Sequence, residues 1–289
     1  MEWHHIINPE DPELDRLAER YKLHPLHIED CRHRDQRAKI EDGHGYLFTV
    51  LKPLRIQEDG ELVAVDMDVF LGADFVITVE ETDCPELREL IKRVRRTLPV
   101  EARADQVYYR VMDELVDSYF PLLDGLHETI DGIEDQALES PTPEVLQSIF
   151  RTKRTLVFLR GILANTRDLI SQLQRMNGQW IAPELSPYFR DVFDHVARSL
   201  DTVEVMRDLL TGSLEVYLSS VANRTNQVMK VLTVLSTVAL PALVISGFYG
   251  MNVKGLPGAE SAHGMGIAVA SMAGVTGVLL WMLRRFGWW

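Results

Sequence analysis

The sequence predicts an α+β domain, made of a mixed sheet with flanking helices, followed by long stalk helices and a two-helix transmembrane hairpin. Three observations predict this order. Runs of β-branched residues alternate with helical periodicity over residues 1–100, helical periodicity alone continues to about residue 230, and two long uncharged stretches follow. The 289 residues suffice for the hairpin and for a separate domain that buries its own core.

The first 100 residues carry the signals of a sheet covered by helices. Three runs rich in β-branched and aromatic residues are expected to be strands: Tyr46–Leu51, Leu62–Leu71 and Phe75–Val79. Apolar residues at intervals of three and four predict helices over Asp11–Leu23 and Pro85–Leu98. Pro25 is expected to interrupt the chain after the first of these helices. We therefore expect helices packed on a sheet.

The next part of the chain is predicted to be helical. A helix over Glu144–Arg175 follows the break at Ser140–Pro143. From Ser186 no stop signal occurs until Gly247 or Gly250, which predicts one helix of about 60 residues, about 90 Å long. The predicted divisions are an α/β domain (1–100), its helical part (101–185), a stalk helix (186–230), the first transmembrane helix (231–250), an external loop (251–264), the second transmembrane helix (265–283) and a basic, aromatic tail (284–289).

The two uncharged stretches are the membrane signal. Val231–Phe248 has 18 residues without a charge, about 27 Å of helix, which is close to the ~30 Å of a hydrocarbon core. Met265–Leu283 forms the second stretch. Pro241 lies inside the first stretch, and membrane helices tolerate such a proline when neighbours satisfy the freed carbonyl. The alternative is a pair of buried core helices, which are usually shorter and carry a polar face.

Charge is distributed unevenly along the chain. The overall net charge is −13, and the first 200 residues hold 38 acids and 24 bases, net −14. An acidic domain argues against a nucleic-acid partner, because phosphate binding needs a basic face. It would attract cations, although an ordinary solvated acidic surface is the alternative. Two cysteines form no disulfide framework, which suits a reducing compartment.

Basic residues predict the topology of the hairpin. Arg224 and Lys230 precede it and Arg284 and Arg285 follow it, whereas the loop between the stretches has only Lys254. By the positive-inside rule both termini are cytoplasmic and the loop over residues 251–264 faces outside. No signal peptide is expected at the start, which has neither a basic segment nor an apolar core.

One stripe of the long helix could line a pore. At steps of three and four it consists of Asn226, Met229, Thr233, Ser236, Leu240, Leu243 and Gly247. Two helices per chain cannot enclose a channel, but several copies around an axis could. The equal alternative is that the stripe packs on the second helix, where small residues permit close approach.

Asn252 comes directly after the first membrane stretch, at or near the membrane surface. A ring of neutral amide oxygens there can hydrogen-bond to the hydration shell of Mg²⁺, which gives up its water reluctantly. Carboxylates would hold the ion more tightly, and conduction requires release as well as capture. The alternative for a lone asparagine is a helix cap.

Several motifs resemble one transporter family. They are Pro25–Asp30, Gln36–Glu41, Phe189–His195 and Asn223–Thr233, then Pro241, and last Tyr249-Gly250-Met251-Asn252. Gly-Met-Asn at the end of the first of two C-terminal membrane helices is the signature of the CorA-type divalent-metal transporters, and the chain is similar to that family over nearly its whole length.

The resemblance implies a homopentameric funnel in the plasma membrane, which in bacteria is the inner membrane. It implies passive influx of Mg²⁺ through one axial pore, and internal divalent cations would hold that pore shut. Gly250, Met251 and Asn252 would form the selectivity ring, and Asn226, Met229 and Gly247 would line the pore. Asp191 would bind a regulatory Mg²⁺ between subunits, with Asp83 of the neighbour as the expected second ligand.

The sequence departs from the familiar pattern at three places. The pore positions 240 and 243 are both Leu, where Met or Thr is familiar, and the loop after the signature carries Lys254 in place of an acid. The Gly255–Gly258 part of that loop is similar to the zinc-transporting ZntB branch. The alternative ions are therefore Zn²⁺, Co²⁺ and Ni²⁺.

Two other classes of function compete with a transporter. One is a hydrolase anchored by the hairpin, with His24, His27 and His33 as metal ligands, but their spacing matches no zinc motif. The other is a membrane-anchored scaffold, which would leave the Gly-Met-Asn placement to accident. The sequence has no Gly-x-x-x-x-Gly-Lys-Ser/Thr phosphate loop, so we expect no nucleotide as energy source and no enzymatic activity.

Overall fold

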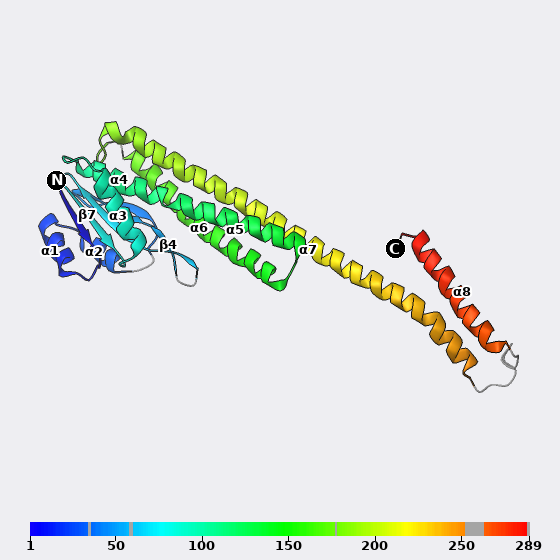
Figure 1. Ribbon diagram of the computed structural model, residues 1–289. Coiled ribbons are helices and arrows are strands. Elements are labelled where there is room, and N and C mark those ends of the chain that lie inside the picture. The colour runs from blue at the N-terminus through cyan, green and yellow to red at the C-terminus, as the bar shows by residue number, and fades with distance from the viewer. Residues whose placement is uncertain (34–35, 58–59, 177, 252–262, 288–289) are drawn as a thin grey trace. The chain divides into compact units, whose positions relative to one another are not determined.

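A computed structural model describes residues 1–33, 36–57, 60–176, 178–251 and 263–287. The chain divides into two compact units, Met1–Leu214 and Glu215–Trp289 (Figure 1). One helix, α7 (Ser186–Tyr249), runs through the end of the first unit and the start of the second, so the prediction of a single long helix is confirmed. The first unit holds a sheet and the helices α1 to α6, and the second holds the rest of α7 and α8 (Gly264–Arg285).

The main sheet is mixed, as predicted. Its strand order is β1-β7-β6-β3-β2, in which β1 runs parallel to β7 and every other pair is antiparallel. The strands are β1 (Glu2–Ile6), β2 (Lys39–Asp42), β3 (Tyr46–Leu51), β6 (Met67–Gly72) and β7 (Phe75–Glu80). A separate two-stranded hairpin is formed by β4 (Leu54–Ile56) and β5 (Leu62–Ala64).

Both faces of the central strands are buried. Every residue of β3, β6 and β7 is buried, because alternate side chains enter two different cores. One core contains Phe48 of β3 and Leu14 and Leu17 of helix α1 (Pro12–Tyr21). On the other face Thr49 forms a 2.9 Å hydrogen bond with the hydroxyl of Tyr108 on α4 (Ala104–Asp117). Helices therefore cover the sheet on both sides.

The prediction of one strand over Leu62–Leu71 is wrong. The chain leaves the hairpin strand β5 at Ala64 and enters the main sheet as β6 at Met67. Between them Asp66 points into the domain and pairs with the Lys52 ammonium group. The amide of Val65 donates a 2.9 Å hydrogen bond to the Pro53 carbonyl. A buried ion pair at Asp66 thus divides a run whose β-branched composition predicted a single strand.

The sequence signals missed three strands and a helix. β1, β2 and β4 are short and carry polar side chains, which hid their alternation. Pro25 does separate two elements, but it is also the first residue of α2 (Pro25–Arg32). A backbone N–H at that position would have no partner within the helix, so a proline is tolerated there. The His24 side chain caps this helix by accepting a 3.2 Å hydrogen bond from the Leu26 amide.

The remaining helices of the first unit follow in sequence: α3 (Pro85–Thr97), α5 (Tyr119–Glu139), α6 (Pro143–Arg175) and the short 3₁₀ turn η1 (Pro183–Leu185). α5 and α6 lie side by side as an antiparallel pair (Figure 1). The Tyr119 hydroxyl at the start of α5 donates a 2.9 Å hydrogen bond to the Lys52 carbonyl, which ties this pair to the sheet domain.

Candidate functional site

Two described helices, α7 and α8, are long and apolar enough to cross a membrane. Their large apolar side chains stay exposed in the single chain, as Leu235 and Leu243 on α7 and Trp281 on α8 illustrate. Such exposure is expected for side chains that meet lipid or another copy of the chain. The second unit therefore has the composition of a membrane hairpin.

The predicted stripe on α7 divides into two groups. Thr233, Ser236 and Leu240 line a groove of about 380 Å³ that also includes Leu279 of α8. This placement beside α8 is what the packing alternative expects. Met229 and Leu243 lie outside that groove and are more than half exposed. Asn226 and Gly247 are exposed as well.

Hydroxyl groups in the membrane part of α7, of which Thr233 belongs to the stripe, direct their hydrogens to the helix backbone. Thr233 Oγ1 donates to the Met229 carbonyl and Thr237 Oγ1 donates to the Thr233 carbonyl, each at 2.8 Å. Ser246 Oγ donates to the Leu243 carbonyl at 3.2 Å. Because the hydrogen is already used, each hydroxyl keeps oxygen lone pairs to offer to a water molecule or a cation.

The helix ends where the Gly-Met-Asn segment begins. Tyr249 is the last residue of α7, and the Gly250 amide donates a 2.8 Å hydrogen bond to the Ser246 carbonyl. A Cβ at position 250 would lie 2.9 Å from that same carbonyl oxygen, so the close turn requires glycine. Met251 is exposed, whereas Asn252 lies outside the described residues.

Asp191, the predicted regulatory ligand, is an exposed residue in the first turns of α7. His195, one turn later, lies with Nε2 3.8 Å from Asp191 Oδ2 and Nδ1 3.6 Å from Asp117 Oδ1 at the end of α4. The Asp191–His195 pair could be found in the sequence as an i,i+4 spacing. Sequence reasoning missed Asp117, since only the fold brings α4 beside α7.

Asp83, the predicted second ligand, lies in the segment between β7 and α3 and pairs with Arg88, whose Nε is 2.9 Å from Asp83 Oδ1. Within the described chain Asp83 pairs with Arg88 and Asp191 lies near His195, so the two carboxylates do not share a partner. In the described part of the chain no cluster of three or more His, Cys, Asp or Glu could hold a metal ion. A regulatory site with these ligands would therefore need a second copy of the chain.

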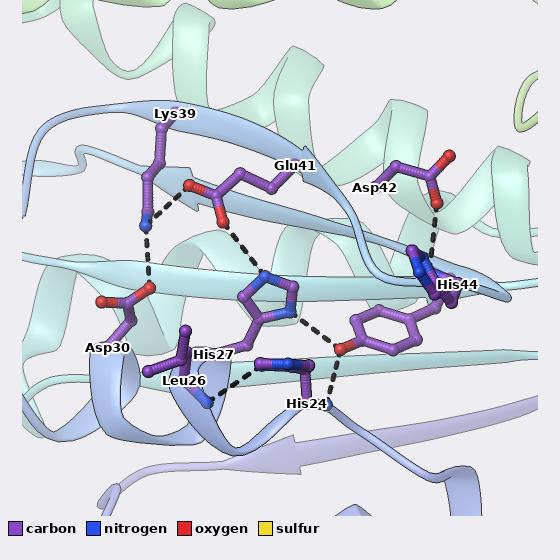
Figure 2. A network of polar contacts seen from close by, with 9 residues as sticks. His24, Leu26, His27, Asp30, Lys39, Glu41, Asp42 and His44 are labelled. Atoms are coloured by element: carbon purple, nitrogen blue, oxygen red, sulfur yellow. Dashed lines mark hydrogen bonds and ion pairs between the residues drawn. The ribbon is translucent and has the colours of Figure 1, made fainter.

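The three histidines of the hydrolase alternative serve the fold. His27 Nδ1 lies 2.8 Å from the Tyr46 hydroxyl and Nε2 lies 3.0 Å from Glu41 Oε2, and Figure 2 shows this ring beside Glu41. The Tyr46 hydroxyl already accepts the His24 amide hydrogen at 2.8 Å, so it donates to His27 Nδ1 and leaves Nε2–H to donate to Glu41. Burial lowers the pKa of His27, which favours this neutral form.

The other groups of this network are also engaged. Lys39 Nζ lies 2.7 Å from Asp30 Oδ2 and 3.0 Å from Glu41 Oε1 (Figure 2). His33 Nδ1 contacts the Glu29 carbonyl at 3.0 Å. The contacts of His27 and Lys39 join α2 to β2 and β3. Both ring nitrogens of His27 are engaged by Tyr46 and Glu41, so neither is left for a metal.

Comparison with known proteins decides the family. The model of the CorA-like Mg²⁺ transporter proteins matches residues 1–285. The chain belongs to this CorA-like family. It is 36% identical over 278 residues to the cobalt/magnesium transport protein CorA of Thermotoga maritima, covering 95% of this chain and 79% of that protein. It is 30% identical over 288 residues to the putative metal ion transporter YfjQ of Bacillus subtilis, covering 99% and 89%.

Solved structures confirm the CorA-like fold. The CorA magnesium transporter of Methanocaldococcus jannaschii matches with a TM-score of 0.84 at 23% identity, covering 99% of this chain and 91% of that one. The full-length CmaX protein matches with a TM-score of 0.77 at 25% identity, covering 99% and 88%. The predicted order of a mixed-sheet domain, a long helix and two candidate transmembrane helices is thereby confirmed.

The family fixes the class of activity. This CorA-like chain is a membrane transporter of divalent cations, and the hydrolase and scaffold alternatives are set aside. The cytoplasmic domain of ZntB from Vibrio parahaemolyticus also shares the fold, with a TM-score of 0.63 at 10% identity over 77% of this chain. That likeness is one of fold alone and does not bear on the transported ion.

Proposed function

We propose that five copies of this CorA-like chain surround one axial pore and conduct Mg²⁺ into the cell. The observation that carries the proposal is the unbroken helix α7 (Ser186–Tyr249), which contains Asp191 in the first unit and ends next to Gly250 in the second. The five-fold number follows the resemblance to CorA-type transporters. Several copies are needed in any case, since one hairpin cannot enclose a pore.

Selection takes place at the outer end of α7. Five Asn252 amides, one from each copy, contact the water shell of the ion through neutral oxygens. The tight turn at Gly250 directly follows the end of α7, two residues before Asn252 in the sequence. Below it the pore meets the side chains of Leu243, Leu240 and Ser236, an alternation of apolar constrictions and hydroxyl oxygens.

The membrane potential drives the ion inward. It supplies about 2.3 kcal/mol per charge per 100 mV, so about 4.6 kcal/mol for a divalent ion, and no nucleotide is consumed. This requires both termini in the cytoplasm of a plasma membrane, the inner membrane in bacteria. The basic residues Arg224, Lys230, Arg284 and Arg285 flank the hairpin on that side.

Internal Mg²⁺ acts as the gate. Asp191 offers exposed carboxylate oxygens, the hard ligands that Mg²⁺ prefers, so it fits the role. Asp83 of a neighbouring copy fits it if the cation displaces the Arg88 guanidinium that now pairs with that carboxylate. A bound ion joins the two subunits, and its loss leaves like charges that repel each other. The helix α7 carries the change to the pore.

Mg²⁺ is preferred as the ion because the Thermotoga relative is named a cobalt/magnesium transport protein and the family description names Mg²⁺. Zn²⁺ is the second candidate, with Co²⁺ and Ni²⁺. The specific observation in its favour is Lys254, which stands after the signature where an acid would help to attract Mg²⁺.

Ion flux into proteoliposomes tests the proposal. The purified chain is reconstituted and uptake of Mg²⁺, Zn²⁺, Co²⁺ and Ni²⁺ is recorded under an inside-negative potential. We expect Mg²⁺ uptake that Asn252→Ala abolishes and that Asn223→Ala, an amide on α7 outside the stripe, leaves intact. Uptake of Zn²⁺ without Mg²⁺ would reassign the ion, and unchanged uptake by Asn252→Ala would refute the selectivity ring.

A further inference from the structure

A large cavity in the first unit is separate from the pore and from Asp191. Its volume is about 1160 Å³, and it lies between one face of α6 and the β2 edge of the sheet with the β4–β5 hairpin. Small-molecule sites in proteins commonly measure ~300–1,000 Å³, so the space is sufficient for a ligand of nucleotide size. All of its described lining residues belong to the unit Met1–Leu214.

One wall of the cavity is a stripe of α6 with two aromatic rings and a cation between them. Phe150, Arg154 and Phe158 follow at intervals of four, so they lie on one helix face. The two phenyl groups are 47% and 38% exposed, which is unusual for phenylalanine in a folded domain. Arg154 Nε donates a long 3.4 Å hydrogen bond to the Phe150 carbonyl, and no described ion pair engages the guanidinium.

The opposite wall supplies further positive charge. Arg37, in the segment before β2, is exposed and forms no ion pair with another described residue. Lys52 also borders the cavity and pairs with Asp66. The positive charge offered to a ligand therefore comes from Arg37 and Arg154, because the charge of Lys52 is neutralised by Asp66. The first 200 residues carry a net charge of −14, so this local excess of positive charge runs against the domain as a whole.

We propose that this cavity binds an anion of the nucleotide class, with its phosphates between Arg37 and Arg154 and its base against the phenyl ring of Phe158, one helical turn beyond Arg154. Planar guanidinium groups match phosphate oxygens through paired hydrogen bonds. Aromatic side chains stack on a base of any kind because every base has a π-face. The site only binds: the chain has no phosphate loop, and no bond of the ligand is broken.

The binding test uses the full-length chain in detergent micelles and titration calorimetry in metal-free buffer. The probes are ATP, inorganic pyrophosphate and adenosine. We expect saturable binding of ATP, weaker binding of pyrophosphate and little binding of adenosine. Arg37→Gln and Arg154→Gln should each weaken ATP binding at least about tenfold, the usual effect of losing a charged hydrogen bond. Phe158→Leu should weaken ATP binding and leave pyrophosphate binding unchanged.

Lys153→Gln is the matched control, because Lys153 is an exposed cation of α6 that does not line the cavity. It should leave ATP binding intact, and unchanged thermal unfolding of each variant establishes that it folds. Equal losses in Lys153→Gln and Arg154→Gln would overturn the site in favour of diffuse attraction. Equal affinity for pyrophosphate and ATP would overturn the nucleotide assignment, and absence of saturable ATP binding, as when a second copy fills the cavity, would overturn both.

Discussion

Replacing Lys52 with methionine tests the account of the sheet domain most sharply. The Lys52 and Asp66 side chains are each 5% exposed and form an ion pair. Asp66 also accepts a 2.9 Å hydrogen bond from the Gln36 amide. Burial raises the pKa of Asp66, although Lys52 and the Gln36 amide act in the opposite direction. The pair is therefore held in a site that penalises a lone charge.

Lys52→Met keeps the length of the apolar stem and removes the charge. The Asp66 carboxylate then has no cation, and breaking a buried pair in this way costs roughly 3–5 kcal/mol. For a unit of about 200 residues, that free energy lowers the apparent Tm by roughly 10 °C. Circular dichroism of the full-length chain in detergent measures the shift, with Lys92→Met, an exposed cation on α3, as the control.

The double variant Lys52→Met with Asp66→Asn separates the lost pair from lost packing. It removes both charges and keeps an oxygen for the Gln36 amide, so it should regain most of the stability. A Lys52→Met chain as stable as the wild type would refute the reasoning. A double variant as unstable as the single one would refute it too, because packing rather than charge would then set the loss.

Two further predictions concern the gate and a second buried acid. Asp191→Ala should raise the internal Mg²⁺ concentration that half-inhibits uptake by at least roughly tenfold, the effect of about 1.4 kcal/mol of binding free energy. Asp194→Ala, at an exposed neighbouring position, should leave that concentration unchanged. Equal dose responses for the wild type and both variants would remove Asp191 from the gate. Burial raises the pKa of Asp68 from 3.8 to about 7, so the folded chain binds the extra proton and its stability falls as pH rises between about 4 and 7, by at most about 4 kcal/mol. Asp68→Asn should therefore raise the apparent Tm at pH 8 by at least twice its effect at pH 5, where the penalty in the wild type is only about 2 kcal/mol. An equal effect at both pH values would contradict the assigned titration.

Elements with local signals could be predicted from the sequence. The long helix α7 and the membrane stretch of α8 follow from uncharged, periodic runs that need no tertiary information. Strands β3 and β7 also follow from composition, because every residue of each is buried. The stripe on α7 was found by helical geometry alone, whereas its partition between the groove with Leu279 and open surface was left undecided.

Features made by contacts between distant segments could not be predicted. β1 pairs with β7 across more than 70 residues, and its half-buried histidines gave no alternating pattern. The break at Asp66 depends on Lys52, which lies in the segment between β3 and β4. Likewise Asp117 reaches His195, and Arg37 faces the cavity with Arg154, only after the chain has folded. The spacing of residues along the sequence does not predict contacts between such distant segments.

The central claim, that the α7 stripe lines the conducting pore, is tested most directly by blocking it. The native Cys31 and Cys84 are both buried, so a cysteine placed at Leu243 is the accessible thiol of the described chain. At ~100° per residue Val238 lies on the opposite side of α7 from the centre of the stripe, which makes Val238→Cys the control. In proteoliposomes a charged thiol reagent should stop Mg²⁺ uptake by Leu243→Cys and spare Val238→Cys. Inhibition of Val238→Cys with Leu243→Cys left active would contradict the account.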